Sequence, residues 1–187
     1  MTNSPRHRAR AAIALASATL PAAAHAEVTA TGADSFVIEE TAIVAAAPRA
    51  VWLALTKPAE WWSDDHTWSG DAANLTLTPQ AGGCFCERIP GGGNVPLDGS
   101  AMHGTVIQAV PDRALRLSAA LGPLQAVPAT GILTFTLEPQ GEGTAVSVRY
   151  AVNGATGFDI AQVSKSVDAV LVEQLAGLTA RLAGGKD

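Results

Sequence analysis

Local motifs of several common enzyme classes are absent from this sequence of 187 residues. It contains no Gly-x-Ser-x-Gly, no His-Glu-x-x-His and no Gly-x4-Gly-Lys-Ser/Thr pattern. It therefore lacks the nucleophile elbow of many hydrolases, the helical zinc site of many proteases and the phosphate-binding loop of many nucleotide hydrolases. The glycine run at 91–93 is followed by neither the lysine nor the helix that a phosphate site needs. We expect no ATP binding, no cofactor and no metal.

Basic side chains are also few. The chain has 12 Lys and Arg against 17 Asp and Glu, a net charge of −5, and its basic residues form no run after residue 10. Nucleic acids and anionic membranes attract clustered Lys and Arg. We therefore expect neither as a partner.

Long apolar segments are missing as well. The one candidate, 11–20, is about ten residues long and falls short of the roughly 18–20 that a membrane-spanning helix needs. It follows three arginines and precedes Ala24-His25-Ala26, an order typical of a secretory signal peptide. We predict a signal peptide at 1–26 and a periplasmic or secreted mature protein of net charge about −8, because the leader removes three basic residues and no acidic ones.

Cysteine occurs twice, as Cys84 and Cys86. An oxidising compartment favours a disulfide. Two residues apart in a strand, however, the side chains point the same way with Cα atoms about 6.5–7 Å apart, at the strained limit for a bridge. A soft-metal site, an intermolecular bridge and a reduced pair remain open alternatives.

The remaining chain predicts one α+β domain over 35–183, preceded by a flexible segment at 27–34 that is small, polar and without a period. A first strand over 35–45 is followed by two short helices, Pro48 to Thr56 and a second one holding the Trp61-Trp62 pair. About six strands with turn residues between them follow, up to residue 152.

The last segment is of a different kind. Apolar residues recur at spacings of three and four from Ile160 to Leu182, which predicts one long amphipathic helix ending at Gly184-Gly185. Strands and helices are thus segregated along the chain, as in α+β folds. Only this helix is long enough to cover a curved antiparallel sheet of about seven strands.

Several short motifs occur in a fixed order along these elements. They are Ala47-Pro48-Arg49-Ala50-Val51-Trp52, Trp61-Trp62, Gly82-Gly83-Cys84-Phe85-Cys86-Glu87 and His103-Gly104-Thr105-Val106. Over about 35–182 the chain resembles the SRPBCC or START-like helix-grip superfamily, in its polyketide-cyclase-like branch of heat-shock-protein ATPase activator homologues. The resemblance implies a sheet that grips the C-terminal helix, with a cavity between them used for apolar molecules. The co-chaperone activity of cytosolic members is not carried over, because an exported protein meets neither that chaperone nor ATP.

Aromatic residues supply the candidate lining of such a cavity, since apolar pockets use aromatic walls and a few fixed polar groups. The alternative for each is a core position with a satisfied indole N–H. The candidates are Trp52, Trp61, Trp62, Trp68, Phe85, Phe135 and Phe158.

Glu87 and His103 are the polar candidates. Glu87 shares a strand face with Phe85 and should point inward, where a carboxylate anchors a ligand, acts as acid or base, or pairs with an arginine. His103 lies in a strand that lines the sheet and either orients a ligand, moves a proton or is structural. Gln125 is a further group that can orient a ligand. His66 lies in an acidic loop, and only its spacing from the neighbouring Asp side chains points to a metal site.

We therefore expect an exported protein that binds a small apolar molecule. Two alternatives stay open. One is a cyclase, dehydratase or hydrolase that uses Glu87 and His103 together, which requires both groups to aim at one point in the cavity. The other is an interaction module with an exposed tryptophan patch at 61–68, which requires a filled interior.

Overall fold

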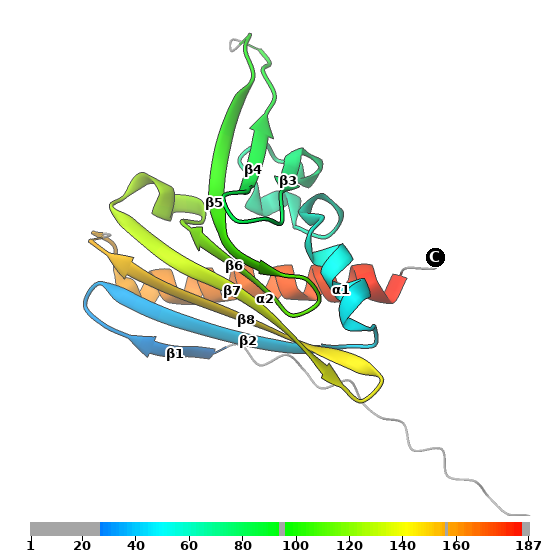
Figure 1. Ribbon diagram of the computed structural model, residues 1–187. Coiled ribbons are helices and arrows are strands. Elements are labelled where there is room, and N and C mark those ends of the chain that lie inside the picture. The colour runs from blue at the N-terminus through cyan, green and yellow to red at the C-terminus, as the bar shows by residue number, and fades with distance from the viewer. Residues whose placement is uncertain (1–26, 94–95, 156, 185–187) are drawn as a thin grey trace, which may run out of the picture.

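A computed structural model describes residues 27–93, 96–155 and 157–184, and the predicted leader at 1–26 lies outside this range. One antiparallel sheet dominates the fold, with the strand order β1-β2-β8-β7-β6-β5-β4-β3 (Figure 1). The strands are β1 Glu27–Thr31, β2 Ser35–Val44, β3 Leu75–Leu77, β4 Cys84–Ile89, β5 Gly99–Val110, β6 Ala114–Ala119, β7 Ala129–Gln140 and β8 Gly143–Gly154.

β1 corrects the sequence prediction. The segment 27–34 was predicted to be flexible, whereas Glu27–Thr31 forms an edge strand antiparallel to β2, with Thr31 opposite Phe36. Pairing to an existing edge uses backbone groups and needs no side-chain period. The sheet therefore has eight strands instead of about seven.

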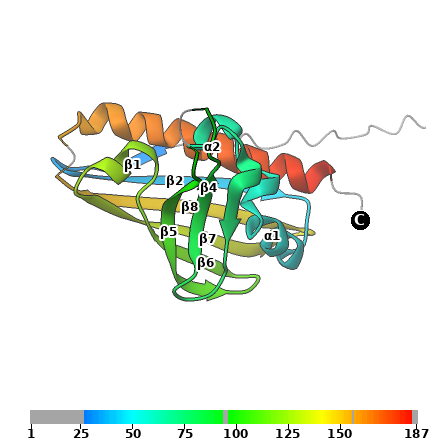
Figure 2. The same cartoon turned by 90° about the horizontal axis from the view of Figure 1, so that it is seen from above.

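Helices follow β2 and end the chain. α1 spans Pro48–Leu55, and the predicted second short helix is replaced by three 3-10 turns, η1 Pro58–Glu60, η2 Asp64–His66 and η3 Ala72–Asn74, with a fourth, η4, at Gly122–Ala126. α2 spans Ile160–Gly184 and packs against β1, β2 and α1 (Figures 1 and 2). The α+β helix-grip prediction is confirmed. Among the described residues, no helix has the length and apolarity to cross a membrane.

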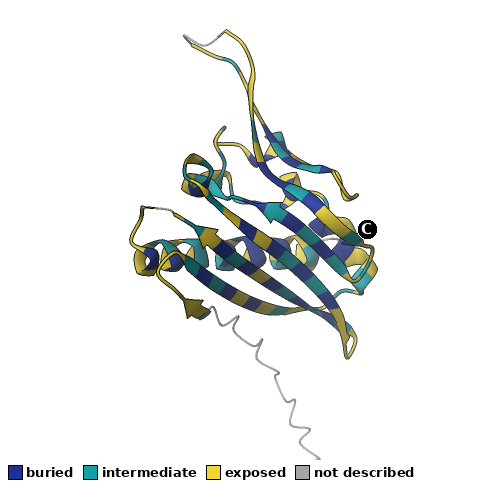
Figure 3. Cartoon of the chain, turned by 60° about the vertical axis from the view of Figure 1, so that its left-hand side comes forward, coloured by how far each residue is buried: buried dark blue, intermediate teal, exposed yellow. Residues whose placement is uncertain are grey.

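The core lies between the sheet and α2. Alternate residues of β7 and β8 are buried, so that buried and less buried positions follow one another along the strands (Figure 3). Tyr150 of β8 is fully buried, and its hydroxyl donates to the carbonyl of Ala119 at 3.1 Å and accepts from the amide of Leu121 at 3.3 Å. These two bonds fix the end of β6, where the chain turns into η4.

Candidate ligand cavity

A cavity of about 530 Å³ lies between the N-terminal half of α2 and the segments 65–68 and 121–123. Its volume falls within the ~300–1,000 Å³ typical of small-molecule sites. The described residues that line it are Trp62, Asp65, His66, Thr67, Trp68, His103, Leu121, Gly122, Pro123, Phe158, Asp159, Gln162, Val163, Ser166, Val167, Val170 and Leu171.

Side-chain size along α2 explains the position of the cavity. Towards the C-terminus of the helix, Leu175 and Leu178 are buried in the core. Towards its N-terminus, the same face carries the smaller Val163 and Val167, which are only partly buried and line the cavity. The sequence period placed all four in one apolar stripe. It could not separate those that fill the core from those that leave space.

Two exposed aromatic side chains belong to the cavity wall. Trp68 is 54% exposed and Phe158 is 40% exposed, although both are large and apolar. Exposed apolar groups around a concave site mark a binding surface more often than isolated ones do.

His103 reaches the cavity because β5 contains a bulge. Phe85 pairs with Gly104 and Cys86 pairs with Met102, so His103 is an extra residue in the β4–β5 ladder. Both His103 and Gly104 are therefore buried, which breaks the alternation of a regular strand. Bulges re-aim side chains in this way, and the sequence pattern carries no signal for this one.

Glu87 points inward, as the alternation in β4 predicted, and is 1% exposed. It does not pair with an arginine. Its Oε2 accepts from His103 Nε2 at 2.8 Å and from the Trp68 amide at 3.1 Å, and its Oε1 accepts from the Ser69 amide. The carboxylate therefore joins β4 to β5 and holds the loop that carries Trp68. It is not among the residues that line the cavity.

Burial and hydrogen bonding act on Glu87 in opposite directions. Burial alone would raise its pKa, but the hydrogen bonds from Ser69, the Trp68 amide and His103 outweigh it and lower the pKa below the ordinary value. A carboxylate that accepts several bonds is stabilised in its ionised form. Glu87 is therefore a charged buried acceptor at neutral pH.

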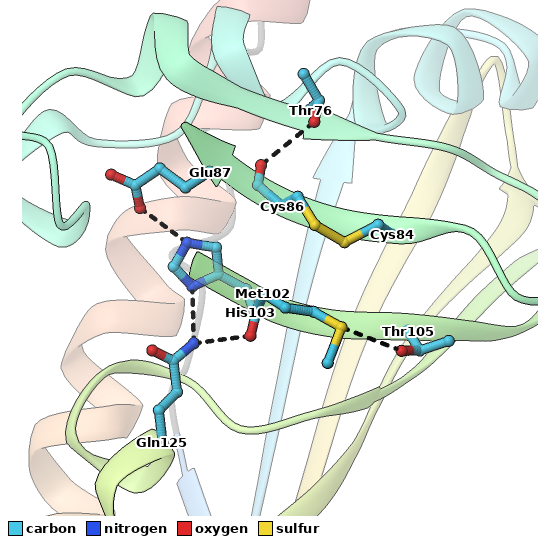
Figure 4. Close-up of a disulfide and its surroundings, with 8 residues drawn as sticks. All are labelled: Thr76, Cys84, Cys86, Glu87, Met102, His103, Thr105 and Gln125. Atoms are coloured by element: carbon cyan, nitrogen blue, oxygen red, sulfur yellow. Dashed lines mark hydrogen bonds and ion pairs between the residues drawn. A yellow bond between two sulfur atoms is a disulfide. The ribbon is translucent and has the colours of Figure 1, made fainter. Parts of the chain in front are cut away.

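Gln125 completes a closed polar network around these groups. Its Nε2 donates to the carbonyl of Met102 at 3.0 Å and faces His103 Nδ1 at 3.4 Å, while its Oε1 accepts from Trp68 Nε1 at 2.8 Å (Figure 4). An ionised Glu87 can only accept, so His103 donates from Nε2 and its Nδ1 is left as an acceptor for Gln125. The network fixes the side chain and the backbone of Trp68 at the cavity wall.

This geometry bears on acid–base chemistry. A catalytic pair would aim both groups at one point inside the cavity. Glu87 and His103 aim at each other instead, and the second ring nitrogen of His103 faces Gln125. Both groups form hydrogen bonds that stabilise the cavity wall around Trp68.

Of the nine predicted site residues, four line the cavity: Trp62, Trp68, His103 and Phe158. The other five do not. Trp52 and Glu87 are buried elsewhere, and Trp61, Phe85 and Phe135 surround a second void of about 20 Å³. A void of that size holds about one water molecule, so it is no site for an organic ligand.

The indole groups of the tryptophan pair differ. Trp62 Nε1 donates to the carbonyl of His66 at 3.1 Å, as a core tryptophan should. Trp61 Nε1 is buried and has no hydrogen-bond partner among the described residues. The alternative of a core position with a satisfied indole N–H thus describes the hydrogen bonding of Trp62 but not that of Trp61.

His66 lies on the cavity wall and contacts Glu173 of α2, with Nε2 and Oε2 3.0 Å apart. The neighbouring Asp64 accepts from the amide of Ala72 at 2.7 Å. Within the described ranges, no group of three His, Cys, Asp or Glu side chains is arranged to hold a metal ion.

Cys84 and Cys86 form a disulfide on the face of β4 opposite Phe85 and Glu87. Their Cα atoms are 5.4 Å apart, closer than in a regular strand and inside the range of ordinary disulfides. The predicted spacing of about 6.5–7 Å assumed a regular strand. The β4–β5 ladder is irregular at this point, between Phe85 and Cys86.

Residues 45–183 match the family described as Activator of Hsp90 ATPase homolog 1-like protein. No curated protein matches the chain in sequence. Similar solved structures include a protein from Rhodobacter sphaeroides, with a TM-score of 0.55 and 20% identity over 86% of this chain and 100% of that chain. A protein from Rhizobium leguminosarum has a TM-score of 0.56 and 19% identity, covering 87% and 99% of the two chains. CalU16 from Micromonospora echinospora has a TM-score of 0.51 and 17% identity, covering 88% and 87%. At these identities the likeness concerns the fold.

Proposed function

The chain belongs to the Activator of Hsp90 ATPase homolog 1-like protein family, and from that premise we propose that it binds a small apolar molecule between the sheet and α2. The observation that carries the proposal is the cavity of about 530 Å³ with Trp68 and Phe158 exposed at its wall. The apolar α2 residues that line it supply the surface whose burial would drive binding.

The charges around the cavity narrow the ligand class. The described lining residues include Asp65 and Asp159 but neither Lys nor Arg. Asp159 accepts from the amides of Ala161 and Gln162 at the start of α2, at 2.9 and 3.2 Å. A ligand carboxylate would find neither Lys nor Arg here and would face these acids. The ligand is therefore uncharged or cationic.

Matched ligands test both parts of the proposal. Decanol, decylamine and decanoate share one chain and differ in the head group, and binding is followed by tryptophan fluorescence and native mass spectrometry. We expect decanol and decylamine to bind, and decanoate to bind at least about tenfold more weakly, a difference of about 1.4 kcal/mol. Equal binding of all three would contradict the charge argument, and binding of none would contradict the cavity.

Val167→Phe narrows the cavity and should weaken binding, because the larger side chain occupies part of the space open to the ligand. Val110→Phe is the matched control, since Val110 is 37% exposed at the end of β5 and does not line the cavity. An unchanged affinity in Val167→Phe would place the ligand elsewhere.

Neither alternative function gains support from the structure. Glu87 and His103 do not aim at a common point in the cavity. The interaction module requires a filled interior, and the cavity argues against it.

Export forms a second part of the proposal. The Cys84–Cys86 disulfide supports it, because disulfides persist in oxidising compartments. Intact mass measurement of the protein recovered from the periplasm or medium of a producing cell tests it. A mature chain that begins at Glu27 is expected, and a full-length chain confined to the cytoplasm would refute it.

A further inference from the structure

Every sulfur atom in the described part of the chain lies in one small patch of the sheet. The chain has two cysteines and two methionines, and Met1 lies outside the described residues. Cys84 and Cys86 lie on β4, and Met102 is the ladder partner of Cys86 on β5. All three side chains extend from the same region of the two strands (Figure 4).

Met102 extends along β5 towards Thr105 (Figure 4). Its Sδ lies 3.6 Å from the hydroxyl of Thr105, and Thr105 is the ladder partner of Cys84. The thioether therefore lies across the strand gap from both cysteines. Met102 is 62% exposed, so packing in the core does not explain its position. Its three rotatable bonds let the sulfur adjust to a bound atom.

We propose that, once the disulfide is reduced, Cys84, Cys86 and Met102 bind one Cu(I) ion through three sulfur atoms. Thiolate and thioether are the soft ligands that select Cu(I) over harder divalent ions. The described residues offer no third His, Cys, Asp or Glu for a conventional site. Glu87 and His103, the sequence neighbours of Cys86 and Met102, bind each other on the buried face. Zn²⁺ favours four nitrogen, sulfur or carboxylate ligands, and these three sulfur atoms do not supply that set.

The binding reaction is balanced by a dithiol reductant. Two electrons and two protons from the dithiol convert the disulfide to two thiols, and the dithiol itself becomes a disulfide. Cu(I) then displaces both thiol protons, forms two thiolate bonds and takes the thioether as a neutral third ligand. The copper keeps its oxidation state throughout. None of the three sulfur residues lines the apolar cavity, so this proposal does not depend on the ligand proposal.

Anaerobic titration tests the site. The mature chain is reduced with dithiothreitol, desalted, checked for its fold by circular dichroism and titrated with Cu(I) against the chromophoric chelator bicinchoninate. We expect one Cu(I) per chain and three sulfur neighbours in X-ray absorption at the copper edge. The unreduced protein and the double variant Cys84→Ser/Cys86→Ser should take none.

Met102→Leu separates a three-sulfur site from a bare cysteine pair. Leucine keeps the volume of methionine at an exposed position, so the fold should be unaffected. Copper affinity should fall by at least about tenfold, the lower end of the loss seen even for outer-shell changes in metal sites. Thr105→Val removes the hydroxyl contact but no sulfur atom. Its copper affinity should therefore fall less than that of Met102→Leu. Unchanged affinity in Met102→Leu, or no copper in the reduced wild type, would overturn the proposal.

Discussion

For Glu87, the sequence predicted the direction of the side chain but not its hydrogen-bond partners. The alternation in β4 predicted that its side chain points inward, and it is buried. The pairing with His103 could not be predicted, because the bulge in β5 changes the face on which residue 103 lies. The loop amides of Trp68 and Ser69 reach Glu87 only in the folded chain.

Glu87→Gln should lower the free energy of unfolding by about 2–3 kcal/mol. A glutamine side chain puts an N–H where an acceptor is needed, and a lost bond to a buried charged group costs this much. Urea denaturation measures the effect. Glu39→Gln is the control, because Glu39 pairs with Arg149 at 2.9 Å with both side chains about half exposed. Its cost should stay below about 1 kcal/mol. Equal effects in the two variants would contradict the role of Glu87 in joining β4, β5 and the Trp68 loop.

The lowered pKa of Glu87 makes part of the stability depend on pH. The unfolded chain takes up this proton at a higher pH than the folded chain does, so stability rises with pH through this window. The contribution is complete above the ordinary value of 4.5 and is lost as the pH falls through the folded pKa. The stability difference between wild type and Glu87→Gln, measured by urea denaturation, should therefore stay constant above pH 4.5 and shrink as the pH falls below it. A constant difference would contradict this pKa direction.

At the scale of elements, α2 was predictable and the site was not. The three-four spacing predicted a helix ending near Gly184, and α2 spans Ile160–Gly184. A strand containing Phe85 and Glu87 was also predicted, and β4 spans Cys84–Ile89. β1 has no side-chain period, and the bulge in β5 leaves no pattern, so both were missed. The cavity wall was expected from aromatic residues, whereas small valines of α2 create much of the space.

At Gly177, α2 lies close to the loop before η2. A Cβ built at Gly177 would overlap the carbonyl oxygen of Trp61. Gly177→Ala should therefore destabilise the protein by about 1–3 kcal/mol, the usual cost of overpacking. Helix propensity alone favours alanine, by about 1 kcal/mol. The sign of the change in Tm on thermal unfolding therefore decides between overpacking and helix propensity.

Gly184→Ala provides the comparison at the last residue of the same helix. A Cβ at Gly184 meets nothing within 4 Å, so this variant should be neutral or slightly stabilised. A stabilised Gly177→Ala variant would show that the helix and the Trp61 loop do not touch as closely as described.

For the whole molecule, a ligand bound in the cavity should raise the thermal stability of the protein. A ligand at about 100 times its Kd adds about 2.7 kcal/mol to the folded state. For a domain of this size that raises Tm by roughly 5–10 °C. Differential scanning fluorimetry with decanol or decylamine measures the shift, and Val167→Phe should show a smaller one. The same shift in both proteins would mean that the ligands act outside the cavity.

The polar network around Trp68 has a consequence for how relatives of this protein can diverge. Its four side chains lie at 68, 87, 103 and 125, far apart in the sequence, and each donates or accepts according to its neighbour. A change at His103 alone leaves a buried carboxylate without one of its donors, which is costly. Substitutions here should accumulate as sets, so that relatives without His103 also replace Glu87, and an alignment of the family should show the two positions changing together.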